Sequence, residues 1–228
     1  TGLTGGTAGY FSAYATNASG TSYGDTLSFS TLQPITDFNI QSAVDAWCAN
    51  PDNAAGTYGD ISDWNTSAVT DMSNLFKEKS NFNSDISEWD VSSVTSMSAM
   101  FYNAPAFNQE IGDWTVSSVT KMSVMFYQAQ AFNQEIGDWD VSSVTDMEAM
   151  FYNAEAFNQE IENWNVSSVT KIKNMFWNAE AFNQEIGDWD VSSVQDMSQM
   201  FNNASAFNKE IGNWTVSSVT DMSNMFYN

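Results

Sequence analysis

The sequence of 228 residues contains no histidine, no arginine and a single cysteine, Cys48. Without histidine, the commonest general base and metal ligand is missing. One cysteine excludes both an internal disulfide and a thiolate metal cluster, and we expect Cys48 to be a small buried hydrophobe. Six lysines against 28 acidic residues give a formal net charge of −22. Because phosphate binding needs clustered cations, this charge excludes duplex nucleic acid as a partner.

Long hydrophobic runs are also missing. No stretch of about 18 apolar residues predicts a membrane span in this segment, and no signal peptide is visible. The chain begins at Thr1 rather than at a methionine, and Asn228 is the last residue before the recurring stretch AFNQ is due. We therefore expect a piece of a longer chain.

What the sequence does contain is one unit of 25 residues, repeated without insertion or deletion. Columns of Ile, Val and Phe keep the same step, beginning at Ile61, Val69 and Phe76. Regularly spaced apolar columns are typical of a solenoid, because one coil cannot bury its apolar face without its neighbours. The tryptophans mark the period, and we expect them to be structural: Trp64, Trp89, Trp114, Trp139, Trp164, Trp189 and Trp214.

Within each unit we predict a short strand, a turn, and either a short helix or a 3₁₀ turn. In residues 118–129, Val119, Met122, Met125, Phe126 and Ala129 have helical spacing, with Ser118 as the N-cap. Residues 106–111, AFNQEI, alternate as a strand does, which predicts a parallel ladder between coils with a rise of about 4.8 Å. The period lies in the range of leucine-rich repeats. The predicted fold class is therefore an α/β repeat solenoid, leucine-rich-repeat-like, over residues 61–228.

Two further segments precede the repeats. Residues 37–49 predict an amphipathic helix with Ile40, Val44, Trp47 and Cys48 on one face, capped by Thr36 or Asp37. The stretch NPDNAAGTYG after it indicates the helix end, so residues 32–60 are interpreted as the N-terminal cap of the solenoid. Residues 1–31 alternate as two strands around the turn NASGTS, which predicts a β-hairpin.

The repeat FNQEIGDWDVSSVTDMEAMFYNA, from Phe132 to Ala154, resembles the BspA-like surface-protein repeat, and the resemblance covers roughly residues 55 to 228. It implies an extracellular, cell-surface setting and a role in adhesion or surface architecture. The hairpin resembles the last hairpin of a fibronectin type III β-sandwich, with Tyr10 in the place of the tyrosine-corner residue and Asn17 and Gly20 in the turn. That resemblance implies a truncated domain in a multidomain parent.

Candidate sites follow from three sets of residues. A column of carboxylates is either solvated or bridged by Ca²⁺, the one cofactor that the sequence suggests; its members are Glu110, Glu135, Glu160, Glu185 and Glu210. An aromatic strip either packs between coils or contacts glycans or another protein; it consists of Tyr102, Tyr127, Tyr152 and Trp177. N-glycosylation sequons occur at Asn17, Asn65, Asn165, Asn203 and Asn213.

These patterns favour a non-catalytic segment of an extracellular surface protein, because every candidate acid recurs in several coils and none stands in a unique constellation. The expected partners are other surface proteins or glycans. One alternative is a subunit of an extracellular filament or sheath that assembles end to end from copies of itself. The other is a carbohydrate-binding module that uses the aromatic strip.

Overall fold

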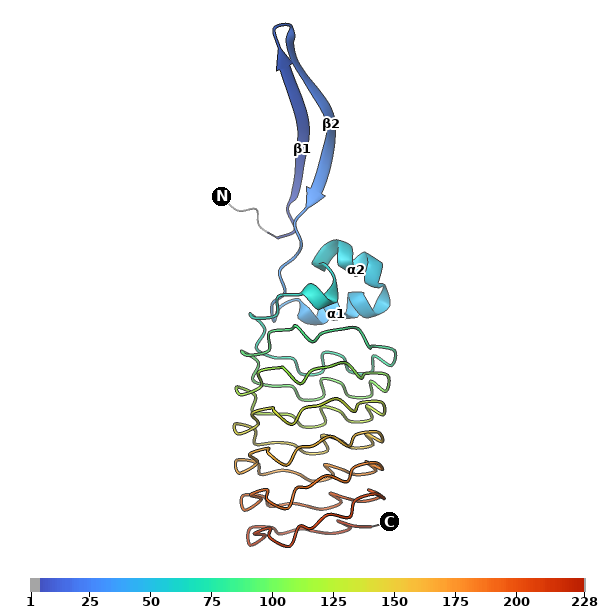
Figure 1. The fold of residues 1–228 in the computed structure, drawn as a ribbon, viewed down its shortest axis with the longest axis vertical. Coiled ribbons are helices and arrows are strands. Elements are labelled where there is room, and N and C mark those ends of the chain that lie inside the picture. The colour runs from blue at the N-terminus through green and yellow to red at the C-terminus, as the bar shows by residue number, and fades with distance from the viewer. Residues whose placement is uncertain (1–4, 228) are drawn as a thin grey trace.

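A computed structural model describes residues 5–227, apart from the side chains of residues 28–30, and shows an elongated molecule (Figure 1). A hairpin of β1 (Ala8–Asn17) and β2 (Gly20–Ser30) projects from one end. Two helices follow, α1 (Ile40–Ala49) and α2 (Pro51–Tyr58), and then the short 3₁₀ helix η1 (Ile61–Asp63). Residues 61–227, here called the coil stack, wind in similar coils along the long axis of the molecule.

The hairpin forms where the alternation predicts it. β1 and β2 are antiparallel, with Phe11 opposite Leu27 and Asn17 opposite Gly20, and an irregularity follows Ser12. Three of its tyrosine side chains are exposed, Tyr10 at 73%, Tyr14 at 71% and Tyr23 at 70%. Residues 1–4 of the expected domain 1–31 lie outside the described residues.

The cap differs from its prediction in three ways. Cys48 is exposed, not buried, because the buried stripe of α1 is Ile40, Ala43, Val44 and Trp47, and Cys48 lies beyond its edge. The N-cap of α1 is Asn39, and no side chain caps this end. The stretch expected to end the helix does end α1 at Ala49 but also contains α2, in which Pro51 occupies the first turn and the Asn50 side chain accepts from the Asn53 N–H at 3.1 Å. Proline at this position starts a helix.

Of the two predicted alternatives the helix is wrong, because residues 123–128 form successive turns. The N–H groups of Met122, Val124, Phe126 and Gln128 donate to carbonyls of the next coil at 2.7–2.9 Å. The alternate N–H groups, beginning with Met125, donate three residues back within their own coil. Isolated parallel bridges accordingly join successive coils at Asp71, Ser96, Lys121, Asp146, Lys171, Asp196 and Asp221.

Two residues of each such turn have positive φ, among them Val124 at 52° and Gln128 at 58°. A right-handed helix cannot pass through these values. The apolar residues with helical spacing are nevertheless the buried ones, since Val119, Met122, Met125, Phe126 and Ala129 are all 0% exposed. The spacing predicted the core correctly and the backbone incorrectly.

The strand predicted at residues 106–111 is absent as well. Here side chains join the coils, beside one backbone bond in which the Ala131 N–H donates to the Pro105 carbonyl at 3.1 Å. The Asn108 side-chain oxygen accepts from the Asn133 N–H at 2.9 Å, and the Gln134 amide donates to the Asn108 carbonyl at 3.0 Å. The same asparagine contact recurs from Asn83 to Asn208. Phe107 and Ile111 point into the core as expected, at 0% and 1% exposure.

Stacked aromatic columns fill the core between the coils. All seven repeat tryptophans are buried, at 3–9% exposure. Each indole N–H donates to a backbone carbonyl; the Trp139 N–H, for example, reaches the Ile111 carbonyl of the preceding coil at 3.0 Å. Phe126 stacks on Phe132 of its own coil at 3.9 Å and on Phe151 of the next at 5.6 Å between ring centroids. The tryptophans therefore both fill and link the coils.

The cap supplies acceptors that a preceding coil would otherwise supply. Within the coil stack, the Thr95 N–H donates to the Thr70 carbonyl at 2.8 Å. At Thr70 itself the acceptor is the Asp37 carboxylate, which receives the N–H and the hydroxyl at 2.7 Å each and the Asp71 N–H at 3.3 Å. Trp64 likewise donates to the Gly59 carbonyl at 3.1 Å. The cap thus accepts hydrogen bonds from donors of the first coil that no preceding coil could accept.

The positive φ of Val124 predicts a stabilising substitution. A β-branched residue is strained in the left-handed region, whereas Asn tolerates it and already occupies the equivalent position at Asn74, Asn174 and Asn224. We expect Val124→Asn to raise the free energy of unfolding by about 1 kcal/mol in chemical denaturation. Val116→Asn is the control, because Val116 is buried without positive φ and should be strongly destabilised. An unchanged or lower stability of the Val124 variant contradicts the prediction.

Loss of the Asp37 carboxylate should weaken the first coil. Asp37→Ala leaves the Thr70 N–H without its acceptor, and we expect a loss of about 1 kcal/mol, as for an exposed cap. Asp37→Asn keeps one acceptor oxygen and should lose less. Hydrogen exchange measured along the chain should show faster exchange at Thr70 and Asp71. Asp25→Ala, which removes a hairpin charge, serves as the control, and equal effects of the two alanine variants would show that Asp37 is no cap.

Candidate functional site

The aromatic strip of Tyr102, Tyr127, Tyr152 and Trp177 forms one continuous stack. Each member follows a buried phenylalanine, so its side chain leaves the core on the opposite side and is half-buried. Successive ring centroids lie 4.6, 4.4 and 4.3 Å apart, and the rings deviate from parallel by only 7–10°. These distances are shorter than those between the buried phenylalanines of successive coils, such as Phe126 and Phe151 at 5.6 Å.

The rings contact one another through their faces, which leaves mainly their edges to solvent. At one end the Lys77 ammonium lies 5.1 Å from the Tyr102 ring centre, a cation–π contact. At the other end the next residue of the column, Asn202, is buried at 6% exposure. This column therefore accepts a polar residue at a buried position. A flat ligand that needs a free ring face does not find one inside this stack.

Partial burial and the neighbouring tyrosines raise the pKa of Tyr127 to about 12. Desolvation is the largest cause, followed by the charges that Tyr152 and Tyr102 would carry. The Tyr127 phenol therefore stays neutral at every physiological pH.

The acidic column lies exposed along the coil stack. Glu135 and Glu160 contribute to a groove together with Asp113, Asp138 and the amide of Gln159. Within residues 5–227 no three carboxylate or thiol groups come close enough to hold a metal ion. Glu185 instead pairs with Lys209 at 2.7 Å. The calcium bridge and the solvated column both stay predictions.

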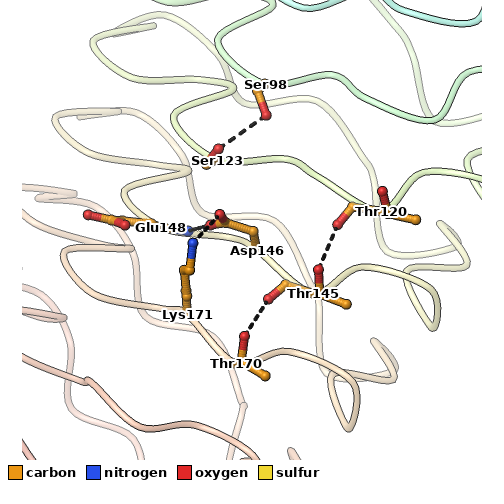
Figure 2. Close-up of polar contacts among 8 residues, drawn as sticks. All are labelled: Ser98, Thr120, Ser123, Thr145, Asp146, Glu148, Thr170 and Lys171. Atoms are coloured by element: carbon orange, nitrogen blue, oxygen red, sulfur yellow. Dashed lines mark hydrogen bonds and ion pairs between the residues drawn. The ribbon is translucent and has the colours of Figure 1, made fainter.

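A second polar surface runs beside the parallel bridges (Figure 2). The hydroxyl of Thr145 donates to the Thr120 carbonyl at 3.3 Å, and that of Thr170 to the Thr145 carbonyl at 3.2 Å. Lys171 pairs with Asp146 of the preceding coil at 3.1 Å. These threonine hydroxyls thus form hydrogen bonds between successive coils.

Comparison with known proteins identifies the repeats. The family described as Mycoplasma protein of unknown function, DUF285, matches residues 47–163 and 132–228. The chain belongs to the DUF285 family. No curated protein and no solved structure matches it. The DUF285 matches include α1 from Trp47 onward, α2 and the coil stack, and they begin after the hairpin.

The five sequons of this DUF285 chain lie in different surroundings. Asn17 and Asn213 are exposed, Asn17 at the hairpin turn. Asn65 and Asn165 are exposed too, but their side-chain oxygens accept from the serine two residues on, Ser67 and Ser167, both hydroxyls at 2.7 Å. Asn203 is half-buried with φ at 56°. Among residues 5–227 no helix is long and apolar enough to cross a membrane.

Sequence reasoning missed a depression at the junction of cap and coil stack. Its lining includes Trp47, Cys48, Lys79 and Ser84, and its volume is about 380 Å³. Lys79 pairs with Asp45 of α1 at 2.7 Å, and the Trp47 indole donates to the Ser84 hydroxyl at 3.0 Å. The available signal was the stretch KEKSN, from Lys77 to Asn81, which departs from the repeat. These contacts fasten the cap to the first coil.

The raised pKa of Tyr127 predicts alkaline destabilisation. The folded pKa lies above the ordinary value of 10, so the stabilisation is fully present below pH 10 and is lost as the pH rises to about 12. We expect the melting temperature to fall over this window, and to fall less in Tyr127→Phe, which keeps the ring but not the phenol. Tyr58→Phe, outside the strip, should behave as the wild type does. Parallel curves for wild type and Tyr127→Phe would contradict the prediction.

Proposed function

We propose that this DUF285 segment is a non-catalytic, structural and adhesive part of an extracellular surface protein. In this proposal the coil stack is a solenoid rod of the leucine-rich-repeat-related class, and its surface contacts proteins or glycans. Membership in a repeat family supports the proposal at its coarsest level. The BspA-like character of the repeat and the fibronectin type III-like character of the hairpin add the surface setting, and both rest on sequence resemblance.

The observation that carries the proposal is the uniformity of the contacts between coils. The tryptophan-to-carbonyl bond recurs at the same spacing of 28 residues from Trp89 to Trp214. The asparagine contact and the parallel bridges recur with the repeat period as well. Because every coil is fixed to the next by the same bonds, the coil stack should be stiff, and its length scales with the number of coils.

The distribution of titratable groups supports a non-catalytic role. An active site needs a few groups whose surroundings differ from those of similar residues nearby. Here Asp90, Asp140 and Asp190 each accept from the serine two residues on, and these bonds lower the pKa of all three carboxyls in the same way. Asn165 makes the same turn without a charge. The carboxylates of Asp90, Asp140 and Asp190 therefore stabilise a turn.

End-to-end assembly into a filament or sheath is the second candidate, favoured by apolar residues exposed on the projecting hairpin. The hairpin exposes Phe11 and Leu27, each at 55%. Soluble monomers seldom expose contiguous apolar patches of large area. Electron microscopy of the unlabelled protein distinguishes this candidate, because filaments with a subunit repeat would support it and dispersed rods would not.

The adhesion proposal is tested by removing two whole coils. Deletion of residues 111–160 joins Glu110 to Ile161 and keeps every column in register, because the deletion is two repeat units long. We expect a folded, shorter rod that binds arrays of glycans and extracellular-matrix proteins more weakly than the full chain, since fewer coils present fewer contacts.

A hairpin deletion, residues 1–31, is the matched control and should leave array binding unchanged. Loss of binding with the hairpin and full binding by the shortened coil stack would place adhesion in the hairpin and overturn the proposal for the coils. Turnover of any array ligand by the full chain would overturn its non-catalytic part.

A further inference from the structure

The aromatic strip unites three phenols in a geometry that free tyrosines do not have. Tyr127 contacts Tyr102 on one face, at 4.6 Å between ring centroids, and Tyr152 on the other, at 4.4 Å. The three come from consecutive coils and lie in a column that the contacts between coils hold in register. All three are half-buried, so their edges are accessible from solvent.

We propose that this strip is a site of oxidative modification, where a dityrosine bond forms between Tyr127 and a neighbouring tyrosine and ties adjacent coils covalently. The proposal goes beyond the adhesive role and does not depend on it. The reagent it requires is a peroxide, acting through a peroxidase in two one-electron steps.

The chemistry begins with the loss of one electron and one proton from each of two phenols, which gives two neutral phenoxyl radicals. The two electrons and two protons reduce hydrogen peroxide to two molecules of water. The radicals then join through a new carbon–carbon bond between ring carbons ortho to the oxygens. The hydrogen on each of these carbons moves to its own phenolic oxygen, which restores both aromatic rings.

The stacked geometry favours this coupling within one molecule. Tyr127 and Tyr152 come from neighbouring coils and lie 4.4 Å apart between ring centroids, so rotation of each ring about its Cβ–Cγ bond can turn the pair edge to edge. That rotation brings an ortho carbon of Tyr127 toward one of Tyr152. The hairpin pair Tyr14 and Tyr23 is a useful comparison, because its centroids are farther apart, at 6.1 Å, and its rings are inclined by 43°.

Tyr127 is the member on which the proposal depends, because it belongs to both stacked tyrosine pairs. Tyr102 and Tyr152 are two coils apart and have no direct stacking contact with each other among the ring pairs of the described residues. Tyr127→Phe removes one phenol and keeps the ring, so the stack and the fold should be preserved. Tyr58→Phe removes a phenol that lies against Trp64 outside the strip.

The experiment exposes dilute protein to a peroxidase and hydrogen peroxide, isolates the monomer under denaturing conditions, and maps linked peptides by mass spectrometry. We expect a peptide pair lacking two hydrogen atoms that joins the coil of Tyr127 to that of Tyr102 or Tyr152. Tyr127→Phe should lose this pair, and Tyr58→Phe should keep it. Oxidation in concentrated urea should also abolish it, since unfolding separates the rings.

Three outcomes would overturn the proposal. One is a wild-type monomer without a strip linkage, although linked peptides from Tyr14 and Tyr23 show that the oxidant worked. The second is an undiminished linkage yield in Tyr127→Phe, and the third is an equal yield in urea. A melting temperature that rises in the linked monomer supports the covalent tie between coils.

Discussion

The structure depends on how each coil divides its backbone hydrogen bonds between itself and its neighbours. From Met122 to Gln128, every second N–H donates to the next coil, and the N–H groups of Met125, Tyr127 and Ala129 donate to a carbonyl three residues back. This alternation requires positive φ at two positions of each turn, met here by residues as different as Val124 and Asn174. A helix would satisfy the same groups within the coil, but it would leave nothing to bind the next coil. Contacts between coils therefore determine the local conformation.

Side chains carry the linkage where the backbone does not. The asparagine contact, as between Asn133 and Asn108, replaces backbone pairing on one side of the coil, and the buried tryptophan N–H satisfies an isoleucine carbonyl. Buried donors and carbonyls without partners would each cost roughly 1–3 kcal/mol, so these side chains are as necessary as the apolar columns. At the N-terminal end, the Asp37 carboxylate accepts from the Thr70 N–H, and the Gly59 carbonyl accepts from the Trp64 indole N–H. The cap thus imitates a coil in its hydrogen bonds while differing from one in its fold.

The aromatic strip shows that a column outside the core can be partly structural. Its rings stack more closely than those in the phenylalanine columns, and its two ends meet a lysine ammonium and a buried asparagine. Such a row adds stacking contacts between coils and still presents ring edges to solvent. This combination of contact and access makes the strip more suited to modification at its edges than to a flat ligand on its faces.

The sequence by itself determined the period, the buried columns, the hairpin and the position of α1, because each depends on the alternation or spacing of apolar residues. It also placed the tryptophans in the core, where all seven lie. Only the tertiary structure decided the course of the backbone within a coil. Val119, Met122 and Phe126 have the spacing of a helix face, yet the adjacent coil offers carbonyls that an isolated segment lacks, and the chain turns to reach them. The exposure of Cys48 and the stacking of Tyr127 likewise depend on neighbours from the first coil or from adjacent coils, which spacing along the chain does not specify.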